Sequence, residues 1–388
     1  MGFGAIITTG DDNLPLPDSL AQWLAEVRVE EELSRPTKFA LRFEDDLCGD
    51  RPAVEGRPEI AANAMVSVLV PDGNALACLV RGRITRVEST ARVGGVGSSL
   101  TAHGESRKVE MDRETVQATW EGQEAQIVTS ILQGYGFEPK VADVTTRTYT
   151  AAEQLNQRGT DLALLDKIAG ENGVEFWLSY KVSPPPPLPP GAGYGIEETA
   201  HFRISPEVPS DTPFDIGEFS LTPLDADAPS LRVSVPGDDC PNVNLFRARV
   251  ESERPNRAVG AAIDAASGET GRTDTSADPA TVAEGRTLDA LDGVTRTIVT
   301  SGPGDDADQS RRDAAALREA SWFVEATVST SAQLLKGRVI RTHQVVNARG
   351  AGPRFSIPYQ AKTVTHVITA ADHMMDMTLR SNVIGEEA

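Results

Sequence analysis

The chain has 388 residues, of which 39% are hydrophobic and 24% charged, so it can form a sizeable core in roughly two to four compact units. Its formal net charge of −20 argues against a nucleic-acid surface as its main function, because binding to phosphates requires a basic surface. A membrane span requires about 18 consecutive apolar residues, and no apolar run in the chain is that long. The N-terminus also lacks the basic residues that begin a signal peptide. We therefore expect neither a membrane span nor a signal peptide.

Residues 1–112 show the alternation of half-buried strands, in which every second side chain faces the core. The apolar residues with this period are Val27, Val29, Phe39, Leu41 and Phe43. A denser apolar run at 65–70 and strand-like segments at 78–87 and 100–104 follow, separated by turn-forming residues. Short strands at regular spacing predict a β-sandwich or β-barrel in this region.

Residues 113–182 change to the period of a helix. Two segments carry apolar residues at helical spacing: Ile127, Val128, Ile131 and Leu132, then Leu162, Leu165, Ile168 and Ala169. Thr160 or Asp161 is well placed to cap the second helix, and Gly173 to end it. Alternating apolar residues at 174–180 then predict a strand, so we expect a small α/β domain here.

Residues 183–218 begin with a polyproline run at 184–190. Polyproline is stiff and cannot donate the hydrogen bonds of a sheet, so this stretch is expected to be an extended strap or loop. Such a run also leaves open an adaptor module that binds an SH3-like partner through its Pro-rich segment.

Residues 219–388 return to strand-like alternation and are expected to form a second β-rich unit. A Gly-, Thr-, Asp- and Ser-rich stretch at 267–283 predicts a loop. A helical insertion is expected near 305–325, with Ala314, Leu317 and Ser321 as its apolar or small residues. Alternation at 339–346 and 375–380 predicts the closing strands.

Two segments have some features of catalytic or phosphate-binding loops. His103-Gly104-Glu105-Ser106 contains a Gly-x-Ser, but a nucleophile elbow requires Gly at position 108, which is Lys. The glycine-rich stretch 94–99 lacks the lysine of a phosphate-binding loop, and its flanks are strand-like. We therefore expect a strand-ending turn and a hairpin turn.

Possible metal ligands and paired carboxylates do not form a recognisable set. The residues weighed are His343, His366, His373, Asp305, Asp306, Asp308, Glu44, Asp45, Asp46, Met374, Met375 and Met377. None has the spacing of a zinc or EF-hand site, and Cys48, Cys78 and Cys240 are too far apart in sequence to imply a disulfide framework. The sequence therefore predicts no catalytic, cofactor-binding or metal-binding residues, and folding in a reducing cytoplasm.

Several motifs occur in a fixed order along the chain. Thr-Ala-His-Gly-Glu-Ser-Arg-Lys-Val-Glu-Met-Asp-Arg occupies 101–113, a helical segment ending in Gly-Tyr-Gly occupies 119–136, and Asn-Gln-Arg-Gly-Thr-Asp-Leu-Ala-Leu-Leu-Asp opens 156–178. Near the end, Tyr359, Val364 and His366 precede Met377-Thr378-Leu379-Arg380. This order resembles the phage late control gene D family, the baseplate hub of contractile tails and the N-terminal module of VgrG spike proteins.

The resemblance implies a β-rich α+β baseplate hub fold with two tube-like β-barrels and a small α/β insertion. The expected boundaries are 1–112 for the first barrel, 113–182 for the α/β domain, 183–218 for the strap and 219–388 for the second barrel. Because the chain ends at Ala388, soon after the last motif, we expect a stand-alone hub with its spike on a separate chain.

The function implied is structural and not enzymatic. Three chains are expected to form a ring that adapts the hexameric tail tube to the trimeric spike, with tube, spike and other baseplate components as partners. The ring is expected to assemble in the bacterial cytoplasm and then belong to a phage tail or contractile injection particle. An alternative is a β-rich peptidoglycan hydrolase associated with a tail.

Overall fold

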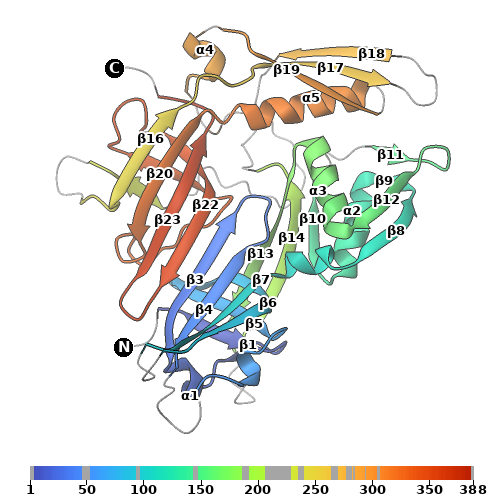
Figure 1. The fold of residues 1–388 in the computed structure, drawn as a ribbon. Helices are drawn as coiled ribbons and strands as arrows, with labels where there is room; N and C mark the ends of the chain where they lie inside the picture. Colours follow the sequence, from blue (N-terminus) through green and yellow to red (C-terminus); the bar gives the residue numbers. More distant parts are fainter. Residues whose placement is uncertain are drawn as a thin grey trace.

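A computed structural model describes residues 4–45, 53–92, 97–142, 147–185, 192–205, 229–234, 240–263, 270–276, 282, 285–292, 294–303 and 306–385. Strands predominate, and the helices are few and short (Figure 1). None of the helices within these ranges has the length and apolar character needed to cross a bilayer. The predicted β-rich α+β class is confirmed.

One 13-stranded sheet joins the two ends of the chain. Its strands lie in the order β16 (Leu245–Val250), β20 (Val324–Ser331), β23 (His373–Ser381), β22 (Pro358–Ile368), β3 (Leu24–Glu32), β4 (Lys38–Glu44), β7 (Ser99–Ser106), β6 (Ala75–Thr90), β5 (Met65–Asp72), β1 (Ile6–Thr9) and β2 (Leu14–Pro15). Strand β21 (Val345–Arg349) pairs with β22, and also with β15 (Ser230–Arg232). Because β22 pairs antiparallel with β3, the two predicted β-rich units share one sheet.

Apolar residues at every second position of these strands point to one face of the sheet, and the core forms on that face. The buried residues of β3, β4 and β23 include Val27, Val29, Phe39, Leu41, Phe43, Met375, Met377 and Leu379. They belong to a single apolar cluster that runs through the N-terminal and C-terminal strands. Gly104 on β7 is required by this packing, because a Cβ there would lie 2.2 Å from the ring of Phe39. The glycine of the Gly-x-Ser motif is therefore explained by packing.

The second unit contains the α/β elements and has its own core. Its elements are η2 (Arg107–Asp112), β8 (Thr115–Trp120), β9 (Gly122–Gln123), α2 (Glu124–Gly134), β10 (Glu138–Val141), β11 (Thr148–Tyr149), β12 (Leu155–Thr160), α3 (Asp161–Asn172), β13 (Glu175–Ser183) and β14 (Gly195–Arg203). The Thr160 hydroxyl accepts a hydrogen bond from the amide of Ala163, and Gly173 ends α3 with φ of 63°. The predicted helix and both of its caps are confirmed.

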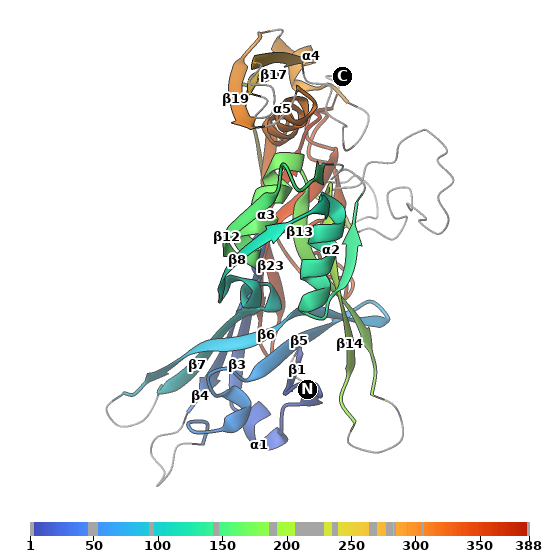
Figure 2. The same ribbon diagram turned by 90° about the vertical axis from the view of Figure 1, so that its right-hand side faces the viewer.

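A third unit lies at the end of the molecule opposite the N-terminal strands (Figure 2). Strands β18 (Thr270–Ser276), β17 (Arg257–Ile263) and β19 (Thr297–Pro303) form a small sheet, with α4 (Leu288–Asp292) beside it and α5 (Asp306–Ala320) on one face. The α5 carboxylate of Asp313 is buried and accepts hydrogen bonds from Thr273 and Thr300 on the sheet. Helix α5 corresponds to the helical insertion predicted near 305–325. The remaining short helices are α1 (Asp18–Ala21) and η1 (Pro58–Ile60).

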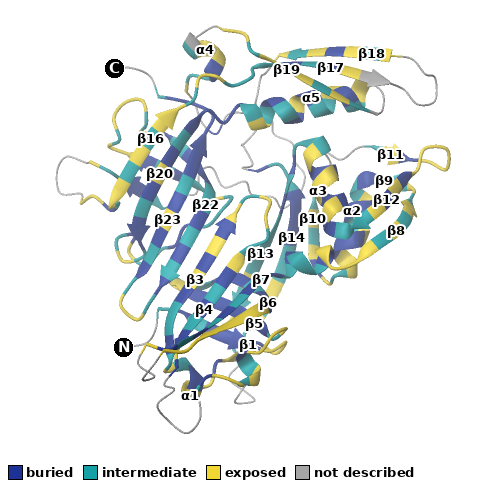
Figure 3. Cartoon of the chain, in the orientation of Figure 1, coloured by how far each residue is buried: buried dark blue, intermediate teal, exposed yellow. Residues whose placement is uncertain are grey.

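Three local expectations differ from the structure. The loop predicted at 267–283 contains strand β18, which pairs antiparallel with β17. The strand predicted from Val339 begins only at Val345, because the chain turns at 342–343 and His343 has a left-handed φ of 68°. In α5, Ala314 is exposed, while Asp313 takes a buried place on the helix. Figure 3 shows this mixture of buried and exposed positions along the helix.

Some expectations concern residues that lie outside the described ranges. These are residues 94–96 of the glycine-rich turn at 94–99, residues 186–190 of the polyproline run at 184–190, residues 267–269, 277–281 and 283 of the predicted loop at 267–283, and Asp46, Cys48 and Asp305. The domain boundaries proposed from the sequence stay predictions.

Candidate functional site

Buried charged groups gather where the N-terminal strands, the α/β unit and the C-terminal strands meet. At the centre, Arg341 Nε donates to Glu31 Oε1 at 2.9 Å, and the amide of Thr342 donates to Glu31 Oε2 at 2.9 Å. The two Arg341 Nη atoms donate to the carbonyls of Cys78 and Leu79 at 2.7 and 3.0 Å. The Glu31 side chain is only 1% exposed, so these charge-assisted hydrogen bonds tie β3, β6 and the segment before β21 together. We call Glu31, Arg341 and Thr342 the junction cluster.

Next to the junction cluster, Trp177 of β13 lies between two histidine rings. Its ring is stacked on that of His343 at a centroid distance of 4.0 Å and on that of His201 at 4.8 Å. His343 Nδ1 lies 3.2 Å from Glu175 Oε2 and 2.9 Å from the hydroxyl of Ser205. The stack therefore connects the α/β unit with the turn that carries Arg341.

Burial sets the protonation of this region. It lowers the pKa of His201 to about 3 and also lowers the pKa of His343, although Glu175 partly opposes the second shift. Burial opposes ionisation of Glu175, yet His343 and Arg380 hold its pKa below the usual value. Near neutral pH the stack thus contains neutral histidines, and Glu175 is ionised beside Arg380.

Further ion pairs join the N-terminal strands to the α/β unit. Glu198 of β14 accepts from Arg81 at 2.7 Å and from Arg107 at 2.6 Å. Lys108 is buried, and its Nζ donates to the carbonyls of Ser34 and Phe176 at 2.6 and 3.0 Å. Burial lowers the pKa of Lys108 to about 8. These contacts fix the α/β unit against the N-terminal strands.

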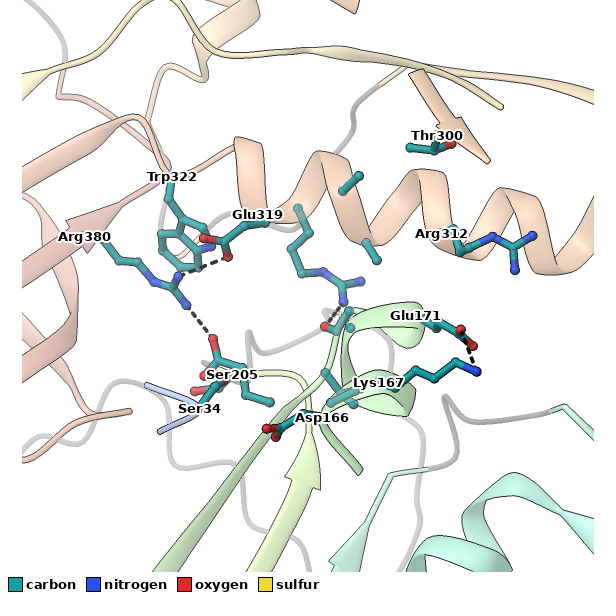
Figure 4. Close-up of a pocket in the computed structure, with 18 of the residues that line it drawn as sticks. Ser34, Asp166, Lys167, Glu171, Ser205, Thr300, Arg312, Glu319, Trp322 and Arg380 are labelled. Atoms are coloured by element: carbon teal, nitrogen blue, oxygen red, sulfur yellow. Dashed lines mark hydrogen bonds and ion pairs between the residues drawn. The ribbon is translucent and has the colours of Figure 1, made fainter. Parts of the chain in front are cut away.

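A pocket of about 630 Å³ lies between α3, α5 and the end of β23 (Figure 4). On one side, Arg380 pairs with Glu175 at 2.6 Å and with Glu319 at 3.3 Å, and its guanidinium lies 4.3 Å from the Trp322 ring centroid. In the middle, Arg318 Nη1 donates to the carbonyl of Gly173 at 2.8 Å. We call this cavity the α3–α5 pocket.

The catalytic alternatives weighed from the sequence find no support in the placement of their residues. The hydroxyl of Ser106 accepts from the amide of Thr37 at 3.2 Å, and His103 lies 3.3 Å from Glu88. Ser106 therefore ends strand β7 and shows no arrangement of nucleophile and base in its described surroundings.

The possible metal ligands are dispersed. His366 pairs with His373 at 3.0 Å, whereas His343 contacts Glu175 and Ser205. Asp308 pairs with Arg147 and Arg311. In the part of the chain that the structure describes, no three His, Cys, Asp or Glu residues are grouped to hold a metal ion.

The remaining candidates serve as local structure. Asp45 accepts from the amides of Ala53 and Val54 at 2.8 and 3.3 Å, as a carboxylate in a turn does. Met375 and Met377 face the core, and the amide of Ile340 lies 3.4 Å from the Met375 sulfur.

The sequence interpretation missed the junction cluster, although one signal points to it. Val27, Val29 and Glu31 share one face of β3, and all three are buried. A charged residue on the core face of a strand requires a buried partner, because an unpaired buried charge is costly. Its partner, Arg341, could not be identified from the alternating pattern around it.

The buried histidines predict an acid-sensitive fold. Burial lowers the pKa of His373 to about 4 and that of His366 well below 6.5, whereas unfolding restores ordinary values. The unfolded chain then binds protons first, so stability is intact above about pH 6.5 and falls as the pH drops towards 4. For His373 alone the expected loss at pH 5 is about 2 kcal/mol.

Urea titrations at pH 7.5, 6.5, 5.5 and 5.0 measure this loss. His373→Gln should lose about 2 kcal/mol less than the parent between pH 7.5 and 5. An identical loss in the parent and His373→Gln would disprove this assignment.

No protein-family model matches this sequence, and no curated protein matches it. The fold is similar to that of the 43 kDa tail protein of prophage MuSo2 from Shewanella oneidensis, with 11% identity, a TM-score of 0.61 and coverage of 98% of each chain. A tail protein from Neisseria meningitidis MC58 gives 10% identity and a TM-score of 0.62, with 98% of this chain and 97% of that chain covered.

A third similar structure is the E. coli c3393 protein, with 12% identity and a TM-score of 0.53 over 98% of this chain and 79% of that chain. That protein is described as a type VI secretion component with structural similarity to the T4 tail proteins gp27 and gp5. This chain therefore has the fold of phage tail and secretion-system tail-like proteins, as its resemblance to the hub family implied.

Proposed function

We propose that this protein is a structural baseplate hub of a contractile tail or phage-like injection system. The observation that carries the proposal is the extent of the fold match, which covers 98% of this chain and 97–98% of the two tail proteins. Almost all of this chain therefore aligns with the shared fold. The role follows from that fold together with the ordered motifs at 101–178 and 358–380.

The contacts within the fold suit an adaptor that must keep its shape under mechanical force. The β3–β22 pairing makes one sheet from both ends of the chain, and buried ion pairs fix the α/β unit against it. Buried polar groups specify one arrangement, because any other leaves them unsatisfied. A hub that passes contraction force between tube and spike requires such a fixed arrangement.

In this proposal three copies form a ring between the hexameric tail tube and a trimeric spike. The partners are the tube protein, the spike and other baseplate components. The protein assembles in the bacterial cytoplasm, acts without catalysis, and remains in the baseplate of the finished particle.

A zymogram on purified cell wall tests the claim that the protein is not an enzyme. A cleared zone that depends on this chain would refute that claim.

The trimer predicts a mass near three times 41.4 kDa, or about 124 kDa. Mass photometry of the purified chain, alone and with spike and tube proteins encoded beside it, measures this mass. A single species near 41.4 kDa under every one of these conditions would contradict the ring.

A further inference from the structure

Two strands of the main sheet, β16 and β6, each have one edge without a partner strand. β16 is the last strand in the sheet order, and among the described strands it pairs with β20 alone (Figure 1). β6 pairs with β5 as far as Arg83, so Arg86–Thr90 has β7 on one side and no described strand on the other. Figure 2 shows this half of β6 running out beside β7. We call Leu245–Val250 and Arg86–Thr90 the two free edges.

Both free edges are able to take a further strand. An unpaired edge presents a row of backbone N–H and C=O groups that can bind another chain. Neither segment contains proline or glycine, so the backbone of neither one prevents pairing. The β16 edge has six residues, which is the usual length of a strand, and every residue from 85 to 92 is exposed.

Exposed apolar side chains lie at the same two edges. Val87 of β6 is 38% exposed, and Val250 of β16 is 37% exposed. Both point to the core face of the sheet, because Val87 is opposite the buried Ala102 and Val250 is opposite the buried Val324. The apolar core is therefore open at both of these edges, and a strand added at each would remove apolar surface from water.

The directions of the strands indicate which partner fits both edges. The seven pairings that lead from β16 to β6 are all antiparallel, so these two end strands run in opposite directions. In copies related by rotation about an axis along the strands, β16 of one copy meets β6 of the next as an antiparallel partner. A foreign strand covers one edge, whereas a second copy of this chain covers both.

We propose that the free edge of β16 in one copy pairs antiparallel with the free edge of β6 in the next copy. The inference rests on the proposed ring of three copies, for which it names the contact between neighbours. This contact is heterologous, since each residue meets a different residue of the neighbouring copy. The main sheet of one copy then continues into that of the next, and Val87 and Val250 become buried.

Disulfide cross-linking tests this pairing. Glu88→Cys is combined in turn with Leu245→Cys, Arg247→Cys and Arg249→Cys, which sample the register along β16. All four side chains are exposed and lie on the face of the sheet opposite Val87 and Val250. Neighbouring strands are about 4.8 Å apart, so a facing pair of thiols comes within disulfide distance.

The cross-linking background is Cys48→Ser/Cys240→Ser, in which the buried Cys78 stays. The trimer found by mass photometry, alone or with its spike protein, is oxidised with copper phenanthroline and run on a non-reducing gel. At least one of the three pairs should give a covalent trimer that a reductant dissolves.

Two sets of variants serve as controls. Glu88→Cys/Arg28→Cys should give no covalent multimer, because Arg28 on β3 of the neighbouring copy would lie five strands away, about 24 Å. Each single-cysteine variant should also remain monomeric on the gel, since a heterologous contact does not bring a residue against its own equivalent.

Three results would overturn the inference. A trimer in which none of the three pairs cross-links would show that the copies meet elsewhere, and it would leave the hub proposal intact. A covalent dimer from Arg247→Cys alone would show that β16 pairs with itself across a two-fold axis. A mass near 41.4 kDa under every condition would contradict the ring itself and the edge pairing with it.

Discussion

Replacement of Glu31 by Gln is expected to lower the free energy of unfolding by about 3–5 kcal/mol, because it leaves the buried Arg341 guanidinium without a counter-charge. The carboxamide also presents donors where the carboxylate accepts from the amide and hydroxyl of Thr342, at 2.9 and 3.1 Å. The measurement is urea unfolding near pH 7.5, where Glu31→Gln should shift the midpoint well below that of the parent.

The neighbouring residue offers a matched control. Glu30 lies on the opposite face of β3 and pairs with Arg28, with both side chains 47% exposed. Glu30→Gln should change stability by less than about 1 kcal/mol, as exposed ion pairs do. Equal effects of Glu30→Gln and Glu31→Gln would show that the junction cluster does not hold β3, β6 and the segment before β21 together.

Leu165→Asp should also cost about 3–5 kcal/mol, since it places a carboxylate without a partner in the core of the α/β unit. Leu165 is fully buried, in one apolar cluster with Val174 and Phe176. Thermal unfolding followed by circular dichroism should show a markedly lower melting temperature, or an insoluble product.

Ala163→Asp is the control on the same helix. Ala163 is exposed in the first turn of α3, where a negative charge is favourable, so its melting temperature should stay within a few degrees of the parent's. A soluble Leu165→Asp protein that melts with the parent would mean that α3 does not pack as described.

Local patterns predicted the elements that depend on nearby residues. The alternation in β3 and β4 predicted their buried faces, and helix α3 was bounded by its Thr160 cap and by Gly173. Each of these features is determined by residues within about one turn or one strand pair.

Such local patterns could not predict which residues far apart in the sequence would contact each other. Glu31 and Arg341 are 310 residues apart in sequence, so no periodicity connects them. His343 fits an alternating strand in the sequence, but its left-handed φ and its stack on Trp177 depend on the α/β unit that packs against it. The α3–α5 pocket likewise requires two helices from different parts of the chain, and only the fold brings Arg318 to Gly173.

Electron cryomicroscopy of the particle that contains this protein tests the hub proposal most directly. The proposal predicts three copies of the chain in a closed ring, with six tail tube subunits on one side and a trimeric spike on the other. The 13-stranded sheet and its β3–β22 pairing should be present within each copy. A reconstruction that places this chain outside the axis between tube and spike, or in any number other than three, would contradict the account.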